Sequence, residues 1–146
     1  MDAGKDVQFD WDGSLELARK LWAYADDLAT AKSTRSGQAD TALTKWEGPY
    51  GDQFKTRKAN EQSSMTSIVA GLRQEAEGWA QAWKMAMDQQ NRVLRARAVN
   101  EHQDSKNIFE KGWDKLTGDD DLPPEPTPVP LPTAPGFAKT ADFYRA

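Results

Sequence analysis

Residues 43–54 decide the fold, and they read LTKWEGPYGDQF. Pro49 is the only proline before residue 123, and a proline disfavours α geometry at the residue that precedes it. Gly48 and Gly51 supply permissive backbone on either side of it. Because proline costs roughly 3 kcal/mol or more inside a helix, the proline-free stretches around this segment predict two helices that meet near Pro49.

Trp46 is the residue that we expect to close the hairpin. It lies on the apolar row of the first helix, so its indole should contact the facing turn of the second helix. A Trp-x-Gly tripeptide alone is compatible with any corner between two helices, but here it falls between two long ones and is followed by Phe54. The predicted turn motif comprises Trp46, Gly48, Pro49, Gly51 and Phe54.

The apolar pattern predicts two helices of unequal length. The first runs from Ser14 to about Lys45, with Asp12 or Ser14 itself as its N-cap. The second is capped by Asp52 and continues to about Ala98. Apolar residues recur in both at a spacing close to 3.5, which is typical of a coiled-coil seam. An antiparallel partner of the first helix's length therefore leaves the second half of the longer helix uncovered.

The uncovered part of the second helix needs an apolar cover. Three candidates are open at this point. The N-terminal residues Val7, Phe9 and Trp11 could fold over it, another chain could bind to it, or a short third helix from Asn107 to Leu116 could fold back.

Composition divides the chain into an N-terminal segment (1–13), a helical body (14–116) and an acidic, proline-rich tail (117–146). Seven of the eight prolines lie between Pro123 and Pro135. Such a stretch favours extended polyproline II backbone, so we expect a spacer or a docking peptide. The predicted fold is all-α: an antiparallel helical hairpin whose second helix is the longer, with an extended proline-rich C-terminal tail.

The composition argues against several classes of function. There is no Cys, His102 is the only His, and the net charge is −4, so thiolate metal sites, a Ser-His-Asp triad and a dedicated nucleic-acid surface are not expected. No apolar run approaches the roughly 20 residues that span a bilayer, and the acidic start does not resemble a Sec signal peptide. We expect no enzyme, no catalytic, cofactor-binding or metal-binding residues, no nucleic-acid partner and no membrane insertion.

Three arginines, Arg92, Arg95 and Arg97, cluster on the second helix. An anionic partner is one interpretation of this cluster. Because the chain is acidic and has no larger basic stripe, we expect a solvated or ion-paired helix face instead, with Glu101, Asp104 and the acidic residues 119–121 as the compensating charges.

Two packed helices bury one face each and leave other apolar positions thinly covered, which predicts association with a further pair of helices. Trp79 is expected in the core, whereas Trp83 could lie in the core or face a partner. The candidate partner-facing residues are Leu21, Trp22, Leu28, Ile68, Leu72, Trp79 and Trp83.

With Trp46-Glu47-Gly48 between two helices, residues 14 to 98 resemble the WXG (Trp-x-Gly) family of helical hairpins exported by the bacterial type VII secretion system, the early-secreted-antigen group. The resemblance implies a four-helix bundle formed by homodimerisation or by heterodimerisation of two hairpins. It also implies recognition of the folded protein by the type VII secretion machinery and export without Sec-type cleavage.

The family's export signal, Tyr-x-x-x-Asp/Glu after the second helix, is not found in this sequence. Tyr24 is followed at the fourth position by Leu28, and Tyr50 by Phe54. Two hypotheses follow. The protein is either a secreted substrate or dimerising partner of that machinery, or a cytoplasmic adaptor that pairs with the helical leader of a larger secreted toxin carrying the signal.

Overall fold

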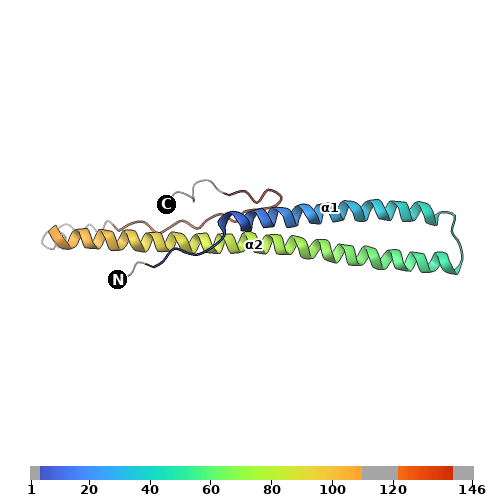
Figure 1. The fold of residues 1–146 in the computed structure, drawn as a ribbon, viewed down its shortest axis with the longest axis horizontal. Coiled ribbons are helices and arrows are strands. Elements are labelled where there is room, and N and C mark those ends of the chain that lie inside the picture. Colours follow the sequence, from blue (N-terminus) through green and yellow to red (C-terminus); the bar gives the residue numbers. More distant parts are fainter. Residues whose placement is uncertain (1–3, 110–121, 140–146) are drawn as a thin grey trace.

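The computed structural model describes residues 4–109 and 122–139. Two helices, α1 (Trp11–Leu43) and α2 (Pro49–Phe109), lie side by side and antiparallel, joined by a short turn at one end (Figure 1). No strand is present in the described residues. The prediction of an all-α antiparallel hairpin with a longer second helix is confirmed.

The first helix begins three residues earlier than predicted. Asp10 is its N-cap, and the Asp10 carboxylate accepts a hydrogen bond from the Gly13 N–H at 2.9 Å. Asp12 and Ser14, the predicted caps, lie inside the first turn, where the Ser14 hydroxyl donates to the Trp11 carbonyl oxygen instead. A cap must stand just outside the helix to reach its free N–H groups, and Asp10 is the acid in that position.

The second helix also begins earlier, at Pro49 rather than after Gly51. Proline suits the first helical position because its φ is already helical and the missing N–H would be unpaired there. The first intrahelical bond runs from the Asp52 N–H to the Gly48 carbonyl oxygen at 3.1 Å. Asp52, the predicted cap, therefore lies in the first turn. Its negative charge interacts favourably there with the positive end of the helix dipole.

The second helix runs without a break to Phe109, beyond its predicted end at Ala98. Residues 107–109 of the predicted third helix belong to α2, and residues 110–116 lie outside the described part of the chain. At 1.5 Å per residue, α2 exceeds α1 by about 40 Å. Neither Gly71 nor Gly78 interrupts it, since each lies inside a continuous helix.

The hydrophobic core lies where four segments meet, around the beginning of α1 and the middle of α2. Residues 4–10 and the first part of residues 122–139 (hereafter the tail) run along the part of α2 that α1 does not reach, and the last part of the tail lies beside the beginning of α1 (Figure 1). The N-terminal cover of the overhang is therefore confirmed, and the tail is a cover that the sequence did not reveal. The buried cluster comprises Leu15, Ala18, Ala76, Ala80, Trp83, Met87, Val129 and Phe137.

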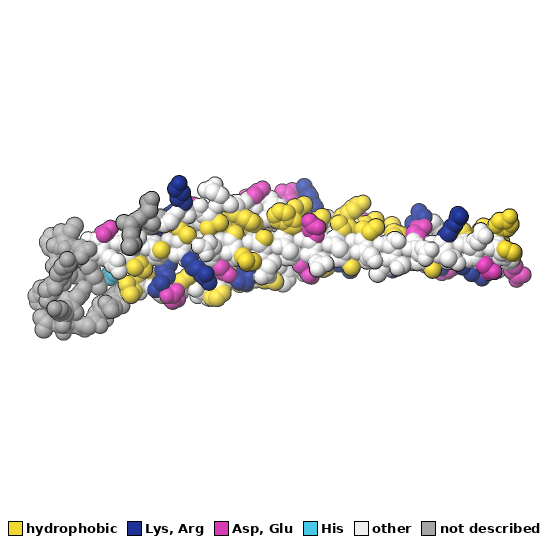
Figure 2. Space-filling model, turned by 90° about the horizontal axis from the view of Figure 1, so that it is seen from below, with side chains coloured by type: hydrophobic (Ala, Val, Ile, Leu, Met, Phe, Trp, Pro, Cys, Tyr) yellow, Lys and Arg dark blue, Asp and Glu magenta, His cyan; other side chains and the backbone are white. Residues whose placement is uncertain are grey.

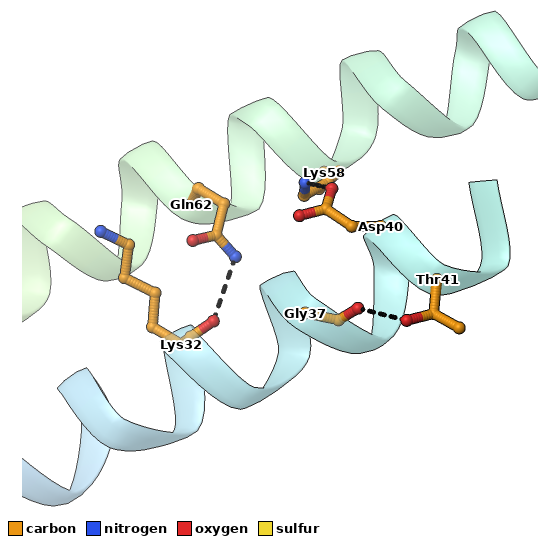
Figure 3. Close-up of polar contacts among 6 residues, drawn as sticks. All are labelled: Lys32, Gly37, Asp40, Thr41, Lys58 and Gln62. Carbon is orange, nitrogen blue, oxygen red and sulfur yellow. Dashed lines mark hydrogen bonds and ion pairs between the residues drawn. The ribbon is translucent and has the colours of Figure 1, made fainter. Parts of the chain in front are cut away.

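The half of the hairpin next to the turn is packed very differently. Between Asp26 and Ile68 no hydrophobic side chain is buried, and all of these residues are described. Polar contacts join the helices instead: Lys58 pairs with Asp40, and the Gln62 side-chain amide donates to the Lys32 carbonyl oxygen at 3.5 Å (Figure 3). Exposed ion pairs contribute only about 0–1 kcal/mol each, so this half is weakly held within one chain.

Candidate interaction surfaces

The turn brings the predicted motif together. The rings of Trp46 and Phe54 lie 5.3 Å apart between centroids, tilted by 39°. Gly48 has a φ of +96°, a conformation that residues with a Cβ adopt at a cost. A Cβ added to Gly51 would lie 2.7 Å from the Trp46 carbonyl oxygen, so a larger residue here would require the backbone of the turn to shift.

A second feature is an exposed apolar face in the middle of the hairpin. On α1, apolar residues recur with i, i+4, i+7 and i+11 spacing, which places them on one side of the helix. On α2 they recur at i, i+4 and i+11. Leu17 and Trp79 line one groove of about 330 Å³ together with Phe9, so the two rows lie on the same side of the hairpin. We name this the open face: Leu17, Leu21, Tyr24, Leu28, Ile68, Leu72 and Trp79.

The open face leaves large side chains in solvent. Ile68 is 53% exposed and Trp79 is 37% exposed, and Leu17 and Tyr24 are exposed as well. Hydrophobic side chains gather in a band along the rod in the view of Figure 2. Contiguous exposed apolar surface of this kind marks sites of protein association.

Five of the seven candidate partner-facing residues lie on the open face. Trp79 was expected in the core, but it is 37% exposed and lines the groove with Leu17 and Phe9. Leu17 and Tyr24 were missed, although their spacing from Leu21 and Leu28 is visible in the sequence. The buried positions of α1 are Ser14, Leu15, Ala18 and Ala25, so Leu17 and Tyr24 lie on a neighbouring side of the helix.

The other two candidates, Trp22 and Trp83, are used inside the chain. Trp83 is fully buried, so it cannot face a partner in this structure. Trp22 packs edge-on against Phe137 with centroids 5.9 Å apart, and the Arg73 guanidinium lies 5.2 Å from the Trp22 ring centroid. Trp83 therefore takes the core position of the two that the sequence left open, and Trp22 is half-buried against the tail.

Three residues of the tail are buried, Val129, Pro132 and Phe137, and two of them anchor the tail in the buried cluster. Val129 and Phe137 are each only 1% exposed and belong to the buried cluster. The tail between them has neither helix nor strand up to residue 133, then a turn at residues 134–136. Of the two roles that the sequence left open, the described part of the tail acts as a docked peptide on its own chain and not as a spacer.

Polar contacts fix the tail at three points. The Val129 N–H donates to the Asp88 carboxylate at 2.7 Å. Arg95 pairs with Glu125 at 2.8 Å and donates to the Pro123 carbonyl oxygen, and Lys139 pairs with Asp12. Partial burial raises the pKa of Asp88, but hydrogen bonds from Lys84 and the Val129 N–H, with the nearby Arg92 charge, outweigh burial and hold the pKa below its ordinary value.

The N-terminal segment is tied to the same overhang. The Gln90 amide accepts from the Val7 N–H and donates to Asp6, both at 2.8 Å. The Gln90 hydrogen bond and the Arg97 ion pair hold the pKa of the Asp6 carboxyl below its ordinary value. With Arg95 and Arg97 both paired to acids, the prediction of an ion-paired basic cluster is confirmed for these two residues.

No group of three or more His, Asp and Glu side chains within the described ranges is arranged to hold a metal ion. Neither helix, over its described length, combines the length and apolarity that crossing a bilayer requires. Comparisons of this chain with protein-family models, with curated proteins and with solved structures found no match.

Proposed function

We propose that this protein is a non-enzymatic helical hairpin that works by pairing its open face with another helical hairpin, as a substrate or partner of a type VII-like secretion system. The pairing partner is a second copy or a related hairpin, and the product is a four-helix bundle. Export by a route other than Sec is part of the proposal.

The observation that carries the pairing is the contrast between the two halves of the hairpin. One half buries Leu15, Trp83 and Met87 under the chain's own end segments. The other half, from Asp26 to Ile68, buries no hydrophobic side chain. The open face lies mainly beside the packed half and reaches the other half only at Leu28 and Ile68. Apolar area removed from water contributes roughly 25 cal/mol per Å², so a second hairpin that covers the exposed Leu17, Ile68 and Trp79 would add stability where the packed half ends.

The secretion context rests on the resemblance of the Trp46-Glu47-Gly48 turn. Its geometry is consistent with that motif, because Trp46 stacks on Phe54 across the turn and Gly48 adopts a positive φ. The absence of Tyr-x-x-x-Asp/Glu at Tyr24 and Tyr50 favours a second candidate. In it, the protein is a cytoplasmic adaptor whose open face binds the helical leader of a larger toxin that carries the signal.

Sedimentation of the full chain tests the pairing. We expect a dimer at micromolar concentration for the wild type and a monomer for Ile68→Glu, because a carboxylate on the open face would be desolvated by pairing. Ile68 is largely exposed, so the substitution leaves the hairpin folded. Met85→Glu is the matched control, since Met85 is also an exposed hydrophobic residue of α2 but lies off the open face.

A wild-type chain that stays monomeric at all concentrations would exclude the homodimer. The heterodimer is then tested by purifying tagged wild type and tagged Ile68→Glu separately from the native host. A heterodimer predicts that a helical hairpin or leader co-purifies with the wild type and not with Ile68→Glu. Export is tested by comparing the culture medium of that host with and without its type VII ATPase. Loss of the protein from the medium in the second strain is the expected result, whereas retention in the cytoplasm of both favours the adaptor.

A further inference from the structure

The tail occupies a groove that has the properties of a peptide-binding site. Its floor is formed by Trp22 of α1 and by Trp83 and Met87 of α2. Into this groove the tail places an aliphatic anchor, Val129, and eight residues later an aromatic anchor, Phe137. Aromatic-lined grooves bind proline-rich segments in this manner because polyproline II backbone is already extended and loses little conformational freedom on docking.

The polar contacts of the groove also suit an extended peptide. The Asp88 carboxylate accepts a hydrogen bond from the Val129 backbone N–H, and the Arg95 side chain donates one to the Pro123 backbone carbonyl oxygen. Both are side-chain contacts to backbone groups, so they do not depend on the ligand's side chains. The N–H of Val129 is one of the few that this stretch offers, since Pro128 and Pro130 flank it.

The fit of the tail to the groove is incomplete. A pocket of about 480 Å³, open to solvent, lies between the tail at Leu131–Ala134 and the α2 surface at Glu77, Gly78 and Gln81. The buried indole N–H of Trp83 has no hydrogen-bond acceptor among the described residues. Phe137 also has a φ of 37°, which is unusual for a bulky side chain. A segment that belonged permanently to the core would be expected to close such gaps.

From these observations we propose that the groove is a binding site for extended proline-rich peptides, that residues 122–139 are its ligand within the chain, and that the tail of a second copy can take their place. The ligand class is a proline-rich segment with an aliphatic anchor and an aromatic anchor eight residues apart. This site is formed by residues other than those of the open face, so it does not depend on the pairing proposed above.

The test separates the tail from the body after the full chain has folded. A specific protease site is inserted between Gly118 and Asp119, outside the described residues, and the folded protein is cut there. A fluorescently labelled peptide of residues 122–139 is then added, and its binding is followed by fluorescence anisotropy. Two unlabelled competitors are compared: the peptide with Val129→Asp and Phe137→Ala, and a matched control with Leu122→Ala, whose side chain is 48% exposed in the docked tail.

We expect the labelled peptide to exchange into the cut protein with saturable affinity. The Leu122→Ala peptide should compete like the wild-type peptide, and the doubly substituted peptide at least about tenfold more weakly. The uncut chain should bind the labelled peptide at least about tenfold more weakly than the cut protein, because its own tail competes at the millimolar effective concentration of a tethered ligand.

Three results would overturn the proposal. Loss of helix content on cutting would show that the tail is an integral part of the core. A cut tail that no peptide displaces over days would show the same. A body that releases its tail, stays helical and does not bind the peptide at millimolar concentration would show that only the covalent connection holds the tail in place. None of these results bears on the sedimentation of Ile68→Glu, so this inference and the pairing fail separately.

Discussion

The α carbon of Gly51 faces the backbone of Trp46 so closely that a Cβ on it would lie 2.7 Å from the Trp46 carbonyl oxygen. Because the obstacle is backbone, it cannot move aside as a flexible side chain would. We expect Gly51→Ala to lower the free energy of unfolding by about 1–3 kcal/mol, measured by urea denaturation followed by far-ultraviolet circular dichroism.

Gly71→Ala is the matched control for Gly51→Ala. Gly71 lies inside α2, and a Cβ there would have no neighbour within 4 Å. Since alanine is favoured over glycine in a helix interior by about 1 kcal/mol, this variant should be more stable than the wild type. Equal effects of the two substitutions would show that the contact with Trp46 does not restrict residue 51.

The double variant Trp46→Ala with Gly48→Ala tests the turn itself. It removes the ring contact with Phe54 and places a Cβ at a φ of +96°, which costs roughly 1–2 kcal/mol for an L-residue. The melting temperature should fall by several degrees. Tyr50→Ala is the comparison, because Tyr50 is 73% exposed and should change the melting temperature little. An unchanged melting temperature of the double variant would place the determinants of the turn elsewhere.

Stability should be concentrated around the buried cluster. We expect Trp83→Ala to lower the free energy of unfolding by about 3–5 kcal/mol, as is typical for a buried tryptophan. Arg35→Ala, which removes the exposed ion pair with Glu61, should cost less than about 1 kcal/mol. Native-state hydrogen exchange offers an independent check: in the monomeric Ile68→Glu chain, amides of residues 26–68 should exchange faster than those of residues 76–87. Uniform protection along both helices would contradict this.

Tail docking should depend on pH through Asp88. Its pKa in the folded protein is below the ordinary value, so the charged carboxylate contributes stability above about pH 3.9, the unfolded value, and this contribution is lost as the pH falls through the folded pKa. The difference in unfolding free energy between the wild type and Asp88→Asn should therefore be present at pH 6 and shrink below pH 4. A difference that stays constant from pH 6 to pH 2.5 would exclude this linkage.

The sequence was sufficient for the hairpin because its determinants are local. Pro49, Gly48 and the spacing of apolar residues act within a few turns of the chain, and they placed the turn and the two arms. The predicted N-caps were wrong by a few positions. Asp10, Asp12 and Ser14 are all good N-cap residues, and only the path of the backbone selects among them. Likewise, no breaker separates Ala98 from Phe109, so the end of α2 could have been placed later.

The roles of the tryptophans could not be predicted, because they depend on a contact between distant parts of the chain. The sequence left open whether Trp83 lies in the core or faces a partner, and it predicted that Trp79 lies in the core. The deciding fact is that Val129 and Phe137 return to α2 from more than forty residues further along the sequence. Proline-rich composition predicts an extended backbone but carries no information about where that backbone docks.

Because the segments at residues 4–10 and 122–139 both pack on the same buried cluster, a pulling force on either of them acts on that cluster first. A motor that draws the protein through a pore by its C-terminal side would meet its main mechanical resistance at Phe137 and Val129. Once these two side chains have been pulled out, Trp83 becomes exposed. The part of the hairpin between Trp83 and the turn would then unfold under a smaller force, because it buries few hydrophobic side chains.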